Sequence, residues 1–272
     1  MLRDSQYLSA SYVMSEEEHR YGDKVHIIDD PVLRTLLARL CSKTTFQPDI
    51  NWLIRYIYQS LVKLVINHEF PLATTQITSR MIDYNEAARF ETMLIDPNSR
   101  VVLVDLARAG MLPSMVCFEY FNYVMNPDNV RLDHIFINRE VDKDNHVIGS
   151  NVSGHKIGGD IDNAIVIFPD PMGATGKSIG KAIDTLRNDV LGTPRKLICL
   201  HLIITPEYLK YLHTHYPEVI VYGLRFDRGL SDPKVFETVP GTYPELERGL
   251  NERQYIVPGA GGLGEIINNS YV

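Results

Sequence analysis

The sequence predicts an α/β fold in which a mainly parallel sheet is flanked by helices. After Arg100, short runs of β-branched and other apolar residues alternate with segments of helical length. The expected strands are residues 101–106, 132–138, 164–168, 197–204 and 219–224. Segments between them open near Pro or Gly and carry an apolar stripe, which predicts helices at 113–124, 176–190 and 206–216. Strands that alternate with helices are typical of a parallel sheet.

Three further parts are expected around this sheet: an N-terminal helical layer, a hairpin and a C-terminal loop structure. Apolar residues recur at helical spacing over 28–41 and 51–68, which predicts an N-terminal helical layer at about 28–68, with Asp49 placed to cap its second helix. Residues 139–150 have a polar centre and predict a hairpin that hangs off the sheet, extending over about 139–156. We expect all of these parts to form one domain, residues 1–272.

The C-terminal part, about 225–265, is rich in Gly and Pro and predicts a loop structure draped over the sheet. Two short motifs recur in it. Residues 227–230 (Asp-Arg-Gly-Leu) resemble 247–250 (Glu-Arg-Gly-Leu), and 239–241 resemble 257–259, which are both Val-Pro-Gly. The two offsets, about 20 and 18 residues, disagree, so a decayed duplication and a chance similarity both remain open.

Charge and composition exclude several classes of protein. The net charge is −7, the pI is about 5.7, and Lys and Arg are scattered, which argues against a nucleic-acid partner. Cys41, Cys117 and Cys199 lie far apart, which predicts neither a disulfide framework nor a zinc site and fits a reducing cytoplasm. No window approaches the roughly 18 apolar residues of a membrane span. We therefore expect a soluble, cytoplasmic protein without a targeting segment or a membrane partner.

The most informative segment is 165–178, an apolar strand that runs into a Gly-rich turn at the start of a helix. Backbone N–H groups and the positive end of a helix dipole favour an anion there, and Thr175 and Ser178 add hydroxyl donors. The triplet Gly176-Lys177-Ser178 matches an ATP-type P-loop only in part, because Pro171 stands where that motif has its first Gly. A nucleotide triphosphatase and an ordinary strand-to-helix turn remain the alternatives.

Asp170 directly precedes this turn. A carboxylate beside a phosphate site is explained if it binds a sugar hydroxyl or a divalent cation. Both are features of a ribose phosphate ligand.

At this point the sequence resembles a known family. Residues 170–178 (Asp-Pro-Met-Gly-Ala-Thr-Gly-Lys-Ser) are similar to the 5-phosphoribosyl-1-pyrophosphate (PRPP) loop of uracil phosphoribosyltransferases, which belong to the type I phosphoribosyltransferases. Further similar segments follow in the family's order: 106–110, its Leu-Arg-Ala-Gly turn; 138–140 and 155–157, the ends of its flexible hairpin; 206–207 and 215–219, its last strand–helix unit; and 250–259, its uracil-binding hood.

The resemblance implies transfer of phosphoribosyl from PRPP to uracil, which gives UMP and pyrophosphate in pyrimidine salvage. It implies Mg²⁺ as cofactor, a homo-oligomer (dimer or tetramer) and a GTP effector. Such chemistry needs orientation and electrostatic stabilisation rather than a nucleophile, because charge builds on the ribose and on the leaving pyrophosphate.

Carried over residue by residue, the resemblance gives a PRPP-binding set, a catalytic set and a base-binding set. Residues 174–178 would bind the 5′-phosphate, Asp170 the ribose hydroxyls, and Arg108 and Arg139 the pyrophosphate. The PRPP-binding set is Asp170, Met172, Gly173, Ala174, Thr175, Gly176, Lys177 and Ser178. The catalytic set is Asp170, Arg108 and Arg139. The base-binding set is Tyr255, Ile256, Gly261 and Gly262.

Two departures keep other functions open. Gly262 stands where the family has an Asp on the PRPP side of the site, and about 20 residues are inserted over 225–246. A catalytically silent PRPP or nucleotide sensor and a phosphoribosyltransferase for another base are therefore alternatives.

Overall fold

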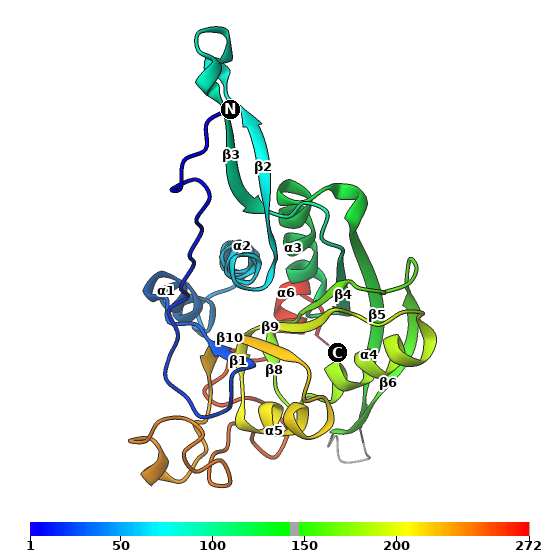
Figure 1. Ribbon diagram of the computed structural model, residues 1–272. Helices are drawn as coiled ribbons and strands as arrows, with labels where there is room; N and C mark the ends of the chain where they lie inside the picture. Colours follow the sequence, from blue (N-terminus) through cyan, green and yellow to red (C-terminus); the bar gives the residue numbers. More distant parts are fainter. Residues whose placement is uncertain (142–146, 272) are drawn as a thin grey trace.

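The computed structural model describes residues 1–141 and 147–271, with side chains of 138–150 excluded, and a twisted eight-stranded sheet forms its centre (Figure 1). The strand order is β1-β10-β9-β7-β4-β5-β6, with β8 beside β9. The strands are β1 Val25–Ile27, β4 Val101–Ala107, β5 Val130–Val141, β6 Val147–Lys156, β7 Ile165–Pro169, β8 Met172–Gly173, β9 Lys196–Ile204 and β10 Ile220–Phe226. Only β6 pairs antiparallel among these described strands. The predicted parallel sheet is confirmed.

Helices cover both faces of the sheet. They are α1 Pro31–Leu40, α2 Asp49–Glu69, α3 Met111–Val124, α4 Lys177–Asp189, α5 Pro206–His215 and α6 Leu263–Asn268, with short 3-10 helices at Arg80–Asp83, Glu86–Ala88, Pro127–Asn129 and Pro233–Val235. Successive strand residues point to opposite faces. Accordingly Leu103 of β4 packs in the core of α1, α2, α3 and α6, whereas Val104 packs in the core of α4 and α5.

The start of α1 follows from its sequence, but the start of α2 differs from the prediction. Asp30 caps α1, because its Oδ1 accepts hydrogen bonds from Val32 N at 2.9 Å and Leu33 N at 3.0 Å. The prediction that Asp49 caps α2 is wrong. Pro48 holds the cap position without a side-chain bond, and Asp49 is the first helical residue, where its charge still favours the helix dipole.

A second, two-stranded sheet stands out from the body of the molecule (Figure 1). It pairs β2 Leu72–Thr78 with β3 Arg89–Ile95 in antiparallel register, and the N-terminal segment lies along it through Leu2 N to Arg89 O at 2.8 Å. The sequence analysis did not anticipate it. Residues of β2 alternate between exposed and half-buried, so no apolar run marks the strand.

The predicted hairpin is longer than expected. Antiparallel pairing of β5 with β6 extends from His134 opposite Lys156 to Val141 opposite Val147, which makes β6 the edge strand of the main sheet. The centre of the predicted hairpin, 142–146, lies outside the described residues.

The two similar motifs of the C-terminal part lie against each other. Leu230 N donates to Arg248 O at 3.0 Å, and the buried Arg228 guanidinium pairs with Glu247 Oε1 at 2.7 Å. A Cβ on Gly229 would lie 2.7 Å from Val257 O, and a Cβ on Gly249 would overlap Asp227 O. Both glycines therefore serve close backbone approach, which explains their recurrence without deciding between duplication and chance.

Within the described ranges, none of the helices has the length and apolar content needed to cross a bilayer.

Candidate functional site

The Gly-rich turn lies at the carboxyl end of β7 and leads into α4. Gly176 occupies the cap position of α4 in the left-handed region, with φ of 79°. The cap residue itself has no side chain to bind the helix, and Thr175 Oγ1 accepts only from Lys177 N, at 3.4 Å. The N–H groups of its first turn, beside the half-buried Thr175 and Ser178, therefore present donors to an anion at the edge of the sheet.

Two glycines allow this turn to pack closely against β9 and α5. A Cβ on Gly176 would lie 2.5 Å from Tyr211 Cδ1, and a Cβ on Gly173 would lie 3.0 Å from Ile204 Cγ2. Any side chain at Gly176 would meet both this contact and an unfavourable φ. The loop geometry therefore depends on glycine at these positions.

The backbone carbonyls of the turn accept hydrogen bonds from Thr205, which precedes α5. Thr205 Oγ1 donates to Ala174 O at 2.7 Å, and Thr205 N donates to Gly173 O at 3.1 Å. The same hydroxyl accepts from Tyr208 N and so caps α5. Thr205 thereby joins the start of α5 to the Gly-rich turn at 170–178, which we call the phosphate loop.

Asp170 is fixed by its main chain to β9. Its N–H donates to Leu200 O at 3.1 Å, and its carbonyl accepts from His201 Nδ1 at 2.5 Å. Its Oδ1 lies 3.4 Å from the N–H of Met172. The carboxylate, half-buried, stands where β7 ends, at the same edge as the start of α4.

His201 is fully buried under Asp170. Because the Asp170 carbonyl only accepts, Nδ1 carries the hydrogen, and Nε2 accepts from the Tyr208 hydroxyl at 2.5 Å. Burial disfavours the charged ring and lowers the pKa of His201 to about 4, against the opposing effect of the hydrogen bond to Asp170. His201 is therefore a neutral bridge between the loop and α5.

Arg108 contacts the C-terminal segment. It follows β4, and its Nη1 donates to Ser270 Oγ at 2.8 Å and to Ser270 O at 3.2 Å. The adjoining helix α6 covers the same turn, since a Cβ on Gly264 would lie 3.7 Å from Ala109 Cβ. Arg139 lies in β5, but its side chain is outside the described part of the chain.

The predicted base-binding residues are spread over the hood and the start of α6. Tyr255 is exposed, whereas Ile256 is buried in the core of α2 and α3. Gly261 has φ of 72°, and Gly262 precedes α6. A Cβ on Gly262 would overlap Glu265 Oε2, so the Glu265 carboxylate occupies the space beside this glycine.

Asp227 fixes the hood backbone next to these residues. Its Oδ2 accepts from Gly259 N at 2.7 Å, and its Oδ1 pairs with Arg225 Nε at 2.6 Å. Arg225 also donates to Gly259 O at 3.0 Å. The loop at 257–259 is thus held by a buried ion pair at the end of β10.

Sequence reasoning missed His201, Thr205, Tyr208 and Tyr211. The only signal was a lone His inside the apolar run of β9, and its partners lie in other elements. It also missed Asp105, whose buried Oδ2 lies 2.7 Å from His134 Nδ1 and whose Oδ1 has no partner among the described residues. Burial raises the pKa of Asp105 despite the His134 contact.

We predict that Gly176→Ala destabilises the protein. Alanine meets both the left-handed φ and Tyr211, so the loss should exceed about 1 kcal/mol and lower the melting temperature by several degrees, roughly 2–4 °C per kcal/mol. Gly154→Ala in β6 is the matched control, because nothing lies within 4 Å of its Cβ. Equal melting temperatures of the two variants would contradict this account.

We also predict a pH dependence that originates from His201. An unfolded His titrates near 6.5, whereas the folded one has a pKa of about 4. Between these values the unfolded state binds more protons, so stability present at pH 7 is lost as pH falls towards 4, by roughly 3 kcal/mol.

The measurement is urea unfolding of the protein and of His201→Gln from pH 7 to pH 4. The variant should be less stable at pH 7 but should lose less stability on acidification. Parallel curves for the two proteins would refute the assignment.

A family model described as uracil phosphoribosyltransferase matches residues 27–243. A uracil phosphoribosyltransferase from Shouchella clausii is 25% identical over 242 residues, covering 89% of this chain and 96% of the relative. One from Thermosipho melanesiensis is 25% identical over 252 residues, covering 89% and 97%.

Among solved structures, the AQ2163 protein from Aquifex aeolicus shares the fold, with a TM-score of 0.70 at 18% identity over 91% of this chain and 99% of that one. The family match spans most of the chain and includes the phosphate loop and Arg108. The chain therefore belongs to the uracil phosphoribosyltransferase family and is a phosphoribosyltransferase.

Proposed function

We propose that this enzyme transfers the phosphoribosyl group of PRPP to uracil and releases pyrophosphate, giving UMP. The observation that carries the proposal is the start of α4 at Gly176, beside Asp170 and at the carboxyl edge of β7, in a chain that the family model matches over 27–243. An anion is favoured at such a helix start. Salvage of a free pyrimidine base is the corresponding role.

The ribose phosphate end of PRPP binds at the loop. Residues 174–178 take the 5′-phosphate through the N–H groups of Thr175, Gly176 and Ser178, because the N–H groups of Ala174 and Lys177 already donate within the turn. The hydroxyls of Thr175 and Ser178 add donors, and Lys177 adds charge from its exposed position. The Asp170 carboxylate takes the ribose hydroxyls. The oxygen donors at this edge suit Mg²⁺, which prefers carboxylate and phosphate oxygens. Asp170 would hold the ion, whose charge would offset that of the pyrophosphate.

Arg108 and Arg139 face the leaving pyrophosphate in this proposal. Arg108 exchanges its bonds to Ser270 for pyrophosphate oxygens, and its planar guanidinium offers several fixed donors. Negative charge grows on the pyrophosphate as its bond to C1′ breaks. Donors that are already oriented therefore stabilise the transition state.

Uracil is read by the hood, chiefly by backbone groups around Gly261. The stretch from Tyr255 to Gly261 contains no charged or amide side chain that could read the base edge. Tyr255 is exposed and offers an apolar ring to the base, whereas Ile256 anchors the hood in the core. The ion pair between Arg225 and Asp227 keeps the backbone in place.

One observation favours a second function. Arg108 is engaged by Ser270, and Gly262 lacks the carboxylate expected from the family resemblance. A PRPP-binding regulator without turnover would also have these features. The resemblance further implies a homo-oligomer and a GTP effector, which sedimentation and activity with added GTP would test.

The direct test is incubation of the protein with Mg²⁺, PRPP and each free base in turn. We expect UMP and pyrophosphate with uracil, and turnover reduced roughly a hundredfold or more in Asp170→Asn, because that change removes charge at nearly constant volume. Circular dichroism of the variant controls for folding. PRPP binding without turnover on any base would support the regulator, and preferred turnover of another base would reassign the substrate.

Glu265 is expected to replace the missing carboxylate at position 262. Its Oε2 occupies the space beside Gly262, so Glu265→Gln should raise the KM for PRPP about tenfold, because it removes a charge from the metal and ribose side. Glu252→Gln on the exposed hood is the control. If both variants keep the KM of the parent enzyme, Glu265 has no part in PRPP binding.

A further inference from the structure

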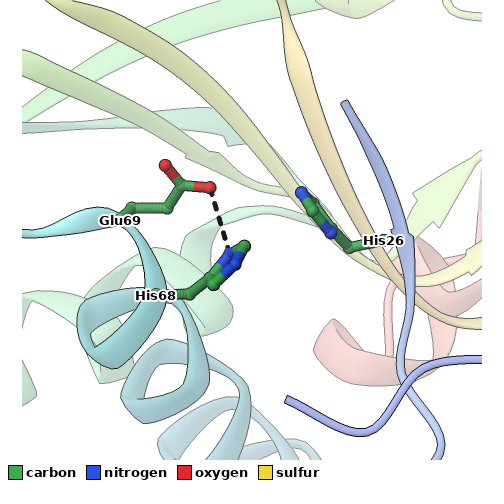
Figure 2. A group of neighbouring side chains, drawn as sticks. All are labelled: His26, His68 and Glu69. Atoms are coloured by element: carbon green, nitrogen blue, oxygen red, sulfur yellow. Dashed lines mark ion pairs between the residues drawn. The ribbon is translucent and has the colours of Figure 1, made fainter. Parts of the chain in front are cut away.

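Three potential metal ligands gather on the face of the sheet covered by α2, as Figure 2 shows. His26 comes from β1, and His68 and Glu69 come from the last turn of α2. One ligand atom from each residue lies within 4.8 Å of the other two. His68 Nδ1 is 3.5 Å from Glu69 Oε1, and the two imidazole centroids are 5.0 Å apart.

This cluster is separate from the phosphate site. Glu69 binds Lys196, the first residue of β9, whereas the phosphate loop contacts the opposite end of β9 through Ile204 and Thr205. Its residues have no part in the transfer reaction described above.

His26 is oriented as a metal ligand usually is. Its Nδ1 donates to Glu16 Oε2 at 3.0 Å, which leaves Nε2 as the acceptor nitrogen. A carboxylate on the far nitrogen fixes the ring and raises its basicity, as in many zinc sites. His26 is buried, and its ring stacks on Tyr222 at 4.5 Å between centroids.

Tyr222 orients the other two residues. Its hydroxyl donates to Glu69 Oε1 at 2.5 Å. The same oxygen lies 2.6 Å from His68 Nδ1, and because a hydroxyl has one hydrogen, His68 must donate to it. His68 therefore also keeps Nε2 as its acceptor. Glu69 Oε2 binds Lys196 Nζ at 2.7 Å, so a cation would use the second lone pair of Oε1, which already accepts from the Tyr222 hydroxyl.

We propose that His26, His68 and Glu69 bind a divalent transition metal ion of the zinc class. Two imidazoles and one carboxylate are a donor set that Zn²⁺ accepts, whereas Mg²⁺ prefers oxygen ligands. The His68 side chain is 36% exposed, so a cation can reach the cluster from solvent.

The geometry requires a modest contraction. Tetrahedral bonds of about 2.1 Å place ligand atoms roughly 3.4 Å apart, and one atom of each residue now lies within 4.8 Å of the other two. The His68 nitrogen at 3.5 Å from Glu69 Oε1 is Nδ1, which donates to Tyr222, so the ring must also turn to bring Nε2 to the cation. His68, exposed at the end of α2, supplies the movement by side-chain rotation. Lys196 opposes the cation, and Glu16 and Glu69 offset it with two negative charges.

The alternative is a hydrogen-bonded network that only joins β1 to α2. Both accounts explain the burial of Glu69 and its bond to Lys196. Only the metal site predicts stoichiometric metal binding that depends on both imidazoles. The hydrogen-bonded network alone predicts no such binding.

The test is titration of the full chain, after chelator treatment and dialysis, with Co²⁺ and with Zn²⁺. We expect one equivalent of Co²⁺ to give the intense visible absorption of a tetrahedral site, and Zn²⁺ to displace it. His68→Gln should weaken Zn²⁺ binding at least tenfold in calorimetry. His213→Gln and His215→Gln on α5 are matched controls and should bind as the parent protein does.

His26→Gln should act as His68→Gln does, provided that its melting temperature without metal shows a folded protein. His68 is exposed, so its variant keeps the test decisive even if His26→Gln does not fold. No stoichiometric binding, or binding that survives His68→Gln, overturns the proposal. Neither result depends on phosphoribosyl transfer.

Discussion

The phosphate loop can present its N–H groups to a ligand only if its carbonyls are bound elsewhere. Apart from Met172 O, which accepts from Ala174 N within the loop, the described contacts to the carbonyls of 170–174 are made by the end of β9 and the start of α5. His201 binds the carbonyl of Asp170, Leu202 N and Ile203 N bind that of Pro171, and Thr205 binds those of Gly173 and Ala174. Buried carbonyls without partners would be costly. The loop geometry therefore depends on β9, which lies beside β7.

This dependence explains what the sequence could and could not predict. The parallel strands and the helices around them follow from local patterns, because a strand buried on both faces is a continuous apolar run. The turn at 170–178 could be predicted for the same reason, because it directly follows such an apolar run. Its supports could not, because His201 meets Asp170 across 31 residues and Arg108 meets Ser270 across 162. Such pairs leave no local pattern.

The errors have equally local causes. Asp49 has the composition of a cap, but Pro48 takes the preceding position, and the helix therefore starts one residue earlier than a capping Asp49 requires. The strand β1 is only three residues long and is paired with β10 alone, so its sequence lacks a periodic run. In β2, Thr residues occupy several positions, so the alternation of apolar and polar residues that predicts a strand is missing.

The hood has little regular structure, yet buried charge fixes it. Asp227 binds Arg225 and Gly259 N, Glu247 binds Arg228 and Gly241 N, and Glu207 accepts from Gly249 N and Leu250 N. Each carboxylate takes N–H groups that a strand would otherwise satisfy. A backbone held in this way can recognise a flat base without side chains, and this property gives the hood its place in the proposed function.

The contact between Arg108 and Ser270 can be compared in energy with the pyrophosphate contact that would replace it in the proposed enzyme. Two hydrogen bonds from a guanidinium to neutral oxygens are worth a few kcal/mol at most. Bonds from the same group to the charged oxygens of a pyrophosphate join two ionised partners and are stronger. The exchange favours the ligand, and Ser270 keeps the guanidinium hydrogen-bonded until PRPP arrives. In the proposed enzyme, the C-terminal segment therefore holds Arg108 in an ordered conformation. Breaking its bonds to Ser270 costs less free energy than the new bonds to pyrophosphate release.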